Sequence, residues 1–258
     1  MSGAPPSFDV SGRSVLVTGG TKGIGAMLAS GFISAGATVF ISARSAEDCK
    51  SVAHDLGPRA IPLPADLSTP AGVRCLAENL AEHVDSLDVL INNAGTTWGA
   101  DLEQYPDDGW DKVLTLNLKA PFQLVVACLP ALRSAVVARG TARVINIGSV
   151  DGLFVPRWES YAYSASKAGL HHLTRHLAKR LAPERITVNA IAPGIFESRM
   201  TSRAFVPGEF QELHDGNPLG RNGRAEDVAG AAIYLASPAT DWVTGVVLPI
   251  DGGWGTLR

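Results

Sequence analysis

The sequence predicts an α/β fold: a single domain built as a doubly wound parallel sheet of about seven strands, with helices on both faces. Three observations predict this fold. Short apolar runs alternate with segments of helical periodicity, a glycine-rich turn follows the first run directly, and no low-complexity linker interrupts residues 1–258. Parallel neighbours need long crossover connections, and the intervening helices supply them.

The first half of the chain predicts strands separated by helices. Short apolar runs mark the strands, at Ser14–Thr18, Thr38–Ser42, Ala60–Pro64 and Leu87–Asn92. Apolar residues at helical spacing mark the helices, at Ile24–Phe32, Glu47–Leu56 and Pro70–Val84. Gly57 and Pro58 end the second helix. Proline suits the start of the third helix, where an N–H group would have no partner.

The second half continues this alternation. Strands are expected at Arg143–Ile147, Ile186–Ile191 and Val246–Ile250, and helices at Asp107–Ala138, Ala162–Leu181 and Glu226–Leu235. The first of these helices is expected to bend near Pro121. Ile195–Asn217 fits the alternation worst, and it mixes apolar side chains with arginines. We expect this segment to be a variable lid over the substrate or a loop packed on the body or a neighbouring subunit.

Composition excludes several classes of protein. The 258 residues carry a net charge of −3, and only 18% are charged, which argues against nucleic-acid binding. The most apolar stretch, Leu124–Ala138, contains Pro130 and Arg133 and is too short to span a membrane. The first ten residues show no secretion signal, and the three cysteines suit reduced thiols. We therefore expect a cytoplasmic protein.

The turn after the first strand carries the first candidate site. It reads Thr18-Gly19-Gly20-Thr21-Lys22-Gly23-Ile24-Gly25, with glycines spaced Gly-x-x-x-Gly-x-Gly. Glycines permit a tight turn and let a pyrophosphate approach the N–H groups at a helix N-terminus, where the helix dipole favours anions. The alternative is an ordinary glycine-rich turn, but its place between a strand and a helix favours a nucleotide site.

Further polar groups lie after the later strands, at the sheet edge where ligands bind in such folds. The turns are Asn92-Asn93-Ala94-Gly95, Gly148-Ser149 and Pro193-Gly194. Tyr163 and Lys167 are four residues apart at the start of a long helix, so both project from one face. Tyr161, six residues before Lys167, lies elsewhere on the helix. Taken alone, Tyr163 and Lys167 could equally be a surface pair.

These motifs occur together in an order and spacing that resemble the classical short-chain dehydrogenase/reductases. The resemblance covers Gly12 to Gly253, and Asn117 belongs to it. It is closest to the 3-oxoacyl-(acyl-carrier-protein) reductases of the rhamnolipid-associated type. It implies a Rossmann fold, a homodimer or homotetramer, and a catalytic tetrad of Asn117, Ser149, Tyr163 and Lys167. In that tetrad Asn117 would hold a water that relays protons to Lys167; the alternative is an Asn satisfied by a neighbouring carbonyl.

Ketone reduction needs a proton as well as a hydride. The unperturbed pKa of tyrosine is near 10, and a nearby positive charge lowers it, so we expect Lys167 and a positively charged nicotinamide together to depress the pKa of Tyr163. Tyr163 would then donate the proton in reduction and accept it in oxidation. Ser149 would donate a hydrogen bond to the carbonyl oxygen as negative charge develops. By resemblance, Lys167 would also bind the nicotinamide ribose.

Two basic residues indicate the cofactor. Arg44 follows the second strand where an acidic residue would favour NAD(H), and Lys22 lies in the glycine turn, so the pocket favours NADP(H) over NAD(H). Asp66 is expected to accept from the adenine amino group or to cap the next helix. Ser198 stands where many family members have threonine. The cofactor residues implied are Gly19, Thr21, Lys22, Gly23, Ile24, Gly25, Arg44, Asp66, Leu67, Asn93, Ala94, Gly95, Tyr163, Lys167, Pro193, Gly194, Ile195 and Ser198.

The sequence thus predicts an NADPH-dependent reductase that converts a ketone to a secondary alcohol, with a 3-oxoacyl thioester or similar apolar carbonyl compound as substrate. One alternative is an NAD(P)-dependent dehydrogenase of a cyclic, terpenoid or steroid alcohol. Another is a regulator that senses NADP(H) without turnover. No metal is expected, because His172 and His176, although four residues apart, lack a neighbouring carboxylate or cysteine cluster.

Overall fold

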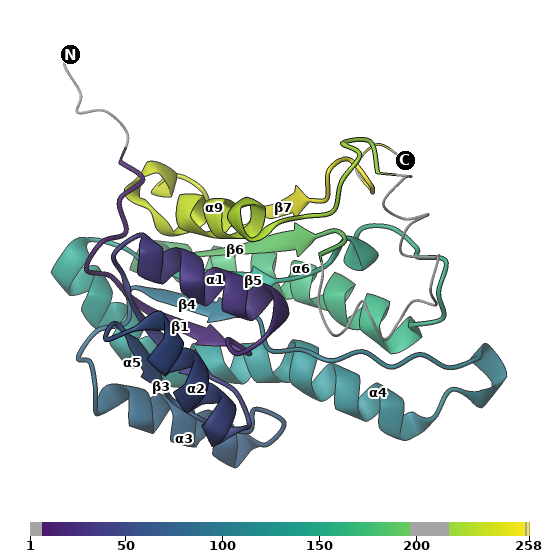
Figure 1. The fold of residues 1–258 in the computed structure, drawn as a ribbon, viewed down its shortest axis with the longest axis horizontal. Helices are drawn as coiled ribbons and strands as arrows, with labels where there is room; N and C mark the ends of the chain where they lie inside the picture. Colours follow the sequence, from purple (N-terminus) through teal and green to yellow (C-terminus); the bar gives the residue numbers. More distant parts are fainter. Residues whose placement is uncertain (1–6, 197–216, 256, 258) are drawn as a thin grey trace.

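Seven parallel strands form one sheet in the computed structural model, which describes residues 7–196, 217–255 and 257 (Figure 1). The strand order is β3-β2-β1-β4-β5-β6-β7. The strands are β1 Ser14–Thr18, β2 Thr38–Ser42, β3 Ala60–Pro62, β4 Val89–Asn92, β5 Ala142–Ile147, β6 Ile186–Pro193 and β7 Val247–Ile250. The order reverses between β1 and β4, which is where doubly wound sheets bind ligands. The predicted fold class is confirmed.

Helices cover both faces of this sheet. They are α1 Gly23–Ser34, α2 Ala46–Leu56, α3 Pro70–Ala81, α4 Asp107–Leu114, α5 Ala120–Arg139, α6 Tyr161–Leu181 and α9 Ala225–Ala236. One core lies between the sheet and α1, α2 and α9; the other lies between the sheet and α3, α5 and α6 (Figure 1). Strand side chains alternate between them: Val15 and Val17 belong to the first core and Leu16 to the second.

The stretch between β4 and β5 differs from its prediction. Instead of a bend at Pro121, α4 and α5 are joined by a π-helical segment, Thr115–Lys119, and Pro121 lies in the first turn of α5. Such π segments are common at functional sites. The combined helical run Asp107–Arg139 is long and apolar enough to span a membrane by length and composition. Its inner side chains pack in the second core, with Leu124, Cys128 and Leu132 nearly inaccessible.

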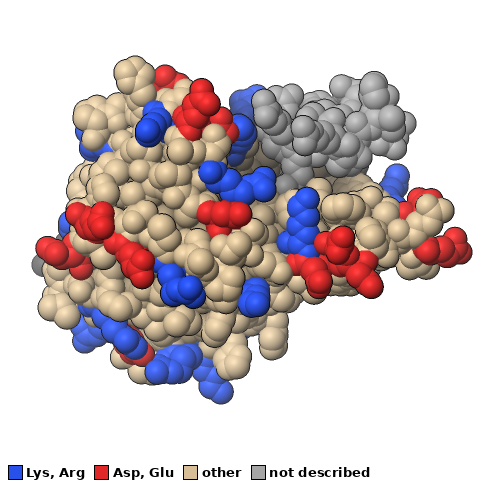
Figure 2. All heavy atoms as spheres, turned by 90° about the horizontal axis from the view of Figure 1, so that it is seen from below, with Lys and Arg blue, Asp and Glu red and all other residues tan. Residues whose placement is uncertain are grey.

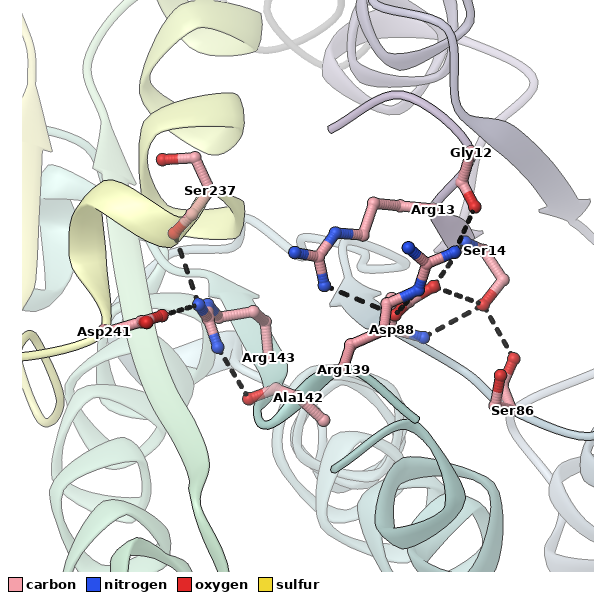
Figure 3. A network of polar contacts seen from close by, with 10 residues as sticks. All are labelled: Gly12, Arg13, Ser14, Ser86, Asp88, Arg139, Ala142, Arg143, Ser237 and Asp241. Carbon is pink, nitrogen blue, oxygen red and sulfur yellow. Dashed lines mark hydrogen bonds and ion pairs between the residues drawn. The ribbon is translucent and has the colours of Figure 1, made fainter. Parts of the chain in front are cut away.

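Charged side chains bind the amino-terminal ends of the central strands together (Figure 3). Asp88, only 2% exposed, accepts from Arg13 at 3.4 Å and Arg139 at 3.0 Å through one carboxylate oxygen. Its other oxygen accepts from the Ser14 backbone N–H at 2.8 Å. Nearby, the buried Arg143 pairs with Asp241. Figure 2 shows acidic and basic groups interspersed over the face viewed, without a single-sign patch.

Helices α1 and α9 approach each other at a pair of small residues. A Cβ atom added at Gly31 would lie 2.4 Å from the Cβ of Ala229. Such a distance is far below van der Waals contact, so a side chain at residue 31 would push the two helices apart. Glycine at this position lets α9 pack directly against the helix that begins at the glycine turn.

Candidate active site

A cavity of about 450 Å³ opens at the carboxyl ends of β1, β4, β5 and β6. Its wall combines the glycine turn, the start of α2, the turns after β4, β5 and β6, and the first turns of α6. The lining residues are Gly19, Thr21, Lys22, Gly23, Ile24, Gly25, Ala43, Arg44, Ser45, Asp48, Asn93, Ala94, Gly95, Ile147, Gly148, Ser149, Tyr163, Lys167, Pro193, Gly194 and Phe196.

The glycine turn needs glycine for two reasons. Gly19 and Gly23 have φ values of +64° and +53°, in the left-handed region that other residues rarely adopt. At Gly25 the backbone is conventional, but an added Cβ would lie 2.1 Å from the Gly19 carbonyl oxygen. The turn therefore presents bare backbone to the cavity at the N-terminus of α1, the geometry that accepts a phosphate group.

Side chains from β1 and β4 hold this turn in place. The Asn93 side-chain amide donates to the carbonyl oxygens of Thr18 at 2.8 Å and Gly19 at 3.3 Å. The Thr18 hydroxyl in turn accepts from the backbone N–H groups of Asn93 at 2.9 Å and Ala94 at 3.0 Å. Asn93 thus acts through the glycine turn, which it holds in place. Thr18 opens the predicted motif but was given no role there, and the structure shows it as a supporting residue.

Tyr163, Lys167 and Ser149 line the cavity together, as predicted. The Lys167 ammonium lies 5.5 Å from the centroid of the Tyr163 ring and donates to the Ile147 carbonyl oxygen at 2.7 Å. A Cβ added at Gly152 would lie 2.7 Å from the Lys167 carbonyl carbon, so the short 3₁₀ turn Val150–Gly152 packs against the α6 backbone. This contact fixes Ser149 relative to the other two residues.

The pKa of Tyr163 is raised in this structure, contrary to expectation. Desolvation by burial is the main cause, and the negative charge of Asp151 adds to it; a hydrogen bond with Ser149 opposes both. Burial lowers the pKa of Lys167 to about 8, although Asp151 opposes the fall. Desolvation thus outweighs the expected effect of the ammonium. Tyr163 is protonated at neutral pH, the state a proton donor requires.

Asp151 is a buried carboxyl group beside the site that the sequence analysis missed. It is 7% exposed, and its Oδ2 accepts from the indole Nε1 of Trp158 at 3.1 Å. Burial raises the pKa of Asp151 to about 6, against the lowering effects of Trp158 and of Lys167. Its backbone N–H donates to Ser149 Oγ at 3.1 Å. An acidic residue two positions after Ser149, in an otherwise apolar segment, was the available signal.

His171 forms part of the floor of the site. Its ring lies so close to Gly148 that an added Cβ there would be 2.1 Å from Nε2. The residue is 2% exposed, and desolvation, followed by the positive charge of Lys167, lowers its pKa to about 4. The imidazole is therefore neutral at pH 7, and residue 148 must be glycine because the ring occupies the space of a side chain.

Asn117 is placed behind the cavity wall by the π-helical segment. Its Oδ1 accepts from the Thr96 N–H at 2.8 Å, and its Nδ2 donates to the Thr96 carbonyl at 2.9 Å and to Ser166 Oγ at 3.0 Å. The side chain is 1% exposed. These contacts connect the turn after β4 to α6. They match the second prediction made for Asn117, in which a neighbouring carbonyl group accepts a hydrogen bond from its side chain.

The family profile described as enoyl-(acyl carrier protein) reductase matches residues 19–255 of this chain. The match runs from the first glycine of the turn to beyond β7 and includes Ser149, Tyr163 and Lys167. The chain belongs to the short-chain dehydrogenase/reductase family.

Relatives in this family are similar over nearly the whole chain. The rhamnolipids biosynthesis 3-oxoacyl-[acyl-carrier-protein] reductase of Pseudomonas aeruginosa is 50% identical over 252 residues, covering 96% of this chain and 98% of the relative. The galactitol 2-dehydrogenase (L-tagatose-forming) of Cereibacter sphaeroides is 35% identical, with 96% of both chains covered. The solved structure of the Pseudomonas aeruginosa RhlG/NADP active-site complex has a TM-score of 0.92 at 49% identity, covering 98% of this chain and 100% of that chain.

Most of the predicted cofactor residues of this short-chain dehydrogenase/reductase line the cavity, but Asp66, Leu67 and Ile195 do not. Asp66 Oδ1 instead accepts from the Ser68 hydroxyl and N–H, and these bonds lower its pKa. Ser198 and residues 197–216 of the expected lid lie outside the described residues. Among the described residues, no three potential metal ligands gather.

Some residues that line the cavity were not predicted. Ser45 and Asp48 belong to the start of α2, and Phe196 lies at the last described position before residue 197. Asp48 pairs with Lys22. In the sequence, Ser45 is recognisable as a helix N-cap and Asp48 as an acidic residue of the first helical turn. Only the fold shows that this end of α2 faces the cavity.

Proposed function

We propose that the chain is an NADPH-dependent reductase of 3-oxoacyl thioesters that yields the 3-hydroxyacyl product. The observation that carries the proposal is the gathering of Ser149, Tyr163 and Lys167 at one end of a cavity that begins at a bare glycine turn. The substrate class is supported by the relative named for 3-oxoacyl reduction, which is 50% identical over 96% of this chain.

The cavity fits a dinucleotide on its own geometry. The space beside Gly25 is closed to any Cβ, and Gly19 and Gly23 hold left-handed conformations, so backbone N–H groups are available to a pyrophosphate. At one side Arg44 and Lys22 provide positive charge for a 2′-phosphate. The solved structure of RhlG, 49% identical, is an NADP active-site complex, which supports the same cofactor here.

The bound cofactor supplies the hydride, and the residues of this chain supply the proton and the charge stabilisation. Tyr163 holds its proton because burial raises its pKa, and it releases that proton to the carbonyl oxygen as negative charge develops there. Ser149 donates a hydrogen bond to the same oxygen. The buried ammonium of Lys167, anchored on the Ile147 carbonyl, stabilises the phenolate that remains.

Asn117 supports this arrangement from behind. Its bonds to Thr96 and Ser166 hold the turn after β4 against α6, so we infer that it fixes the distance between the cofactor and Tyr163. Its proposed water relay to Lys167 would run through the same packed region. The four residues of the tetrad together argue against a regulator that only senses NADP(H), because such a regulator needs no proton donor.

Reduction of an enoyl thioester is a different reaction, although the family profile carries that description. Tyr161, the other tyrosine at the start of α6, donates its hydroxyl to Glu159 Oε1 at 3.0 Å and does not line the cavity. The tyrosine that does line it is Tyr163, close to Ser149. Both substrates carry a carbonyl oxygen that two hydroxyls can bind, so the relative named for 3-oxoacyl reduction, 50% identical over 96% of this chain, is what favours ketone reduction.

A substrate panel tests the proposed function. NADPH oxidation is followed with 3-oxoacyl thioesters, 2-enoyl thioesters, cyclic diketones, ketosteroids and sugar ketones, each at matched concentration. We expect the highest kcat/KM with 3-oxoacyl thioesters. Activity confined to the other ketones would move the protein to the dehydrogenases of cyclic, steroid or sugar alcohols, which use the same residues in reverse. No activity with any carbonyl compound would contradict the enzyme assignment.

Location and assembly are further parts of the proposal. The three cysteines are free, and Cys49 and Cys128 are buried, which suits the reducing cytoplasm. Large apolar side chains are exposed on α5, at Phe122 and Val126, and next to β7, at Trp242. Exposed apolar surface favours association. We infer a cytoplasmic homodimer or homotetramer, and light scattering with gel filtration measures the mass.

A further inference from the structure

The Arg44 side of the cavity contains an ion pair between two of its own lining residues. Lys22 Nζ lies 2.5 Å from Asp48 Oδ2, and both side chains are partly exposed, by 50% and 38%. We propose that Asp48 is a specificity-determining residue: its carboxylate competes with the 2′-phosphate of NADPH for Lys22 and so limits the preference for NADPH over NADH. The inference rests on the proposed function, because it concerns the affinity for that cofactor.

The position of Asp48 is fixed by the start of α2. Ser45 caps this helix, and its hydroxyl accepts from the Asp48 backbone N–H at 3.0 Å. The carboxylate therefore projects from the first turn toward the cavity wall that includes Arg44 and Ser45. Lys22 comes from the glycine turn, at the N-cap of α1, and its side chain makes no cap bond there. The Lys22 ammonium therefore connects the glycine turn before α1 to the first turn of α2.

The charges at this site work against one another. A 2′-phosphate bound here carries close to two negative charges and meets Arg44, Lys22 and Asp48. Arg44 and Lys22 attract it, whereas the Asp48 carboxylate repels it and already occupies the Lys22 ammonium. At a separation of about 6 Å in water, repulsion between a dianion and a carboxylate corresponds to about a tenfold loss of affinity. NADH has a hydroxyl at the 2′ position and escapes this repulsion.

A binding experiment tests the inference without relying on turnover. Isothermal titration calorimetry at low salt gives Kd for NADP⁺ and NAD⁺ with the full-length wild type, Asp48→Asn and Glu47→Gln. Glu47 is the matched control, because it lies in the same helical turn, carries the same charge, is exposed and does not line the cavity. We expect Asp48→Asn to bind NADP⁺ about thirtyfold more tightly, about tenfold from the lost repulsion and the rest from the released Lys22 ammonium, and NAD⁺ about as before. Glu47→Gln should change either Kd by less than about twofold.

A double-mutant cycle isolates competition from simple repulsion. In a Lys22→Met background no ammonium remains to be released, so the gain from Asp48→Asn should fall to about tenfold, the part due to repulsion alone. An equal gain in both backgrounds would overturn the competition. The gain should also shrink as salt is raised, because screening weakens all of these terms.

The outcomes separate this inference from the proposed function. If the wild type binds NADP⁺ and Asp48→Asn matches Glu47→Gln, Asp48 has no effect on specificity and the inference alone fails. Weaker binding of both dinucleotides by Asp48→Asn would also overturn it, because the carboxylate would then accept a hydrogen bond from the cofactor. If the wild type binds neither dinucleotide, the proposed function fails as well.

Discussion

The indole N–H of Trp158 donates to the carboxylate of Asp151 at 3.1 Å, within the segment that joins Ser149 to Tyr163. This bond fixes an aromatic side chain to an acidic group held beside the catalytic residues. Trp158 also packs with Phe154 around a small cluster of Val150, Ile195 and Trp254. The orientation of the Trp158 indole near the site therefore depends on its hydrogen bond to the buried carboxyl group of Asp151.

Asp151→Asn should change how stability depends on pH. The folded-state pKa of Asp151 is raised from 3.8 to about 6, so its contribution to stability is full below about pH 3.8 and is lost as pH rises through about 6. Asparagine does not ionise. As pH rises from below 3.8 to above 6, the free energy of unfolding of the variant should therefore increase relative to the wild type by about 3 kcal/mol. About half of this change should occur between pH 5 and pH 8.

Urea unfolding of both proteins at several pH values measures this difference. His171 acts in the opposite direction: its pKa is lowered from 6.5 to about 4, so its contribution is lost as pH falls. That effect is common to both proteins and cancels in the comparison. A difference in stability that stays constant with pH would show that Asp151 ionises as freely in the folded protein as in the unfolded chain.

Tyr163→Phe should abolish reduction and leave cofactor binding intact. The change removes the proton donor and keeps the ring beside the Lys167 ammonium. We expect kcat to fall by about a thousandfold or more, with Kd for NADPH changed by less than about twofold. Tyr161→Phe is the control, because its hydroxyl is bonded to Glu159 away from the cavity. Equal activity of both variants would mean that another group donates the proton.

Gly148→Ala should destabilise the protein through a single contact. The new methyl group would lie 2.1 Å from His171 Nε2, and the buried ring has little room to move. We expect a loss of about 2 kcal/mol in the free energy of unfolding. Gly230→Ala, in α9, is the control because nothing lies within 4 Å of its added Cβ. Adding His171→Ala to Gly148→Ala should cost less than the sum of the two changes.

Asp88→Asn should lower the stability of the protein at the amino-terminal ends of the central strands. It removes the carboxylate that pairs with Arg13 and Arg139, of which Arg13 has a side chain only 11% exposed. A buried guanidinium left without its partner costs about 3 kcal/mol. Thermal and urea unfolding measure the loss. The exposed Asp85 provides a control, since Asp85→Asn should change stability by less than about 0.5 kcal/mol; equal effects would rule out a role for the network.

The strands were predictable because their signals are local. The predicted bounds of β1 and β2 coincide with the observed ones, since each run is apolar on both faces and ends at a turn. The pairing of Tyr163 with Lys167 was also predictable, because helical geometry fixes residues four positions apart. The π-helical segment before α5 was not predictable. Asn117, which lies in it, contacts Thr96 and Ser166 from distant parts of the chain, and local sequence does not show such contacts.

The errors concern desolvation and tertiary approach. The expected fall in the pKa of Tyr163 relied on two positive charges, Lys167 and the nicotinamide, but burial raises this pKa and the Lys167 ammonium is held by a backbone carbonyl. The adenine contact of Asp66 stays a prediction, and in this structure its Oδ1 accepts from Ser68. Asp48 and Asp151 gained their significance only when folding brought them to Lys22 and Lys167. The spacing of residues in the sequence does not predict such tertiary contacts.

The close contact of Gly31 with Ala229 has a mechanical consequence. Helix α1 begins at the glycine turn that lines the cavity, and α9 packs against α1 at this contact. Because residue 31 has no side chain, the two helices are in direct contact, and a lateral displacement of one helix requires the other to move with it. The glycine turn at the start of α1 and the body of α9 should therefore keep a fixed separation, set by this one contact.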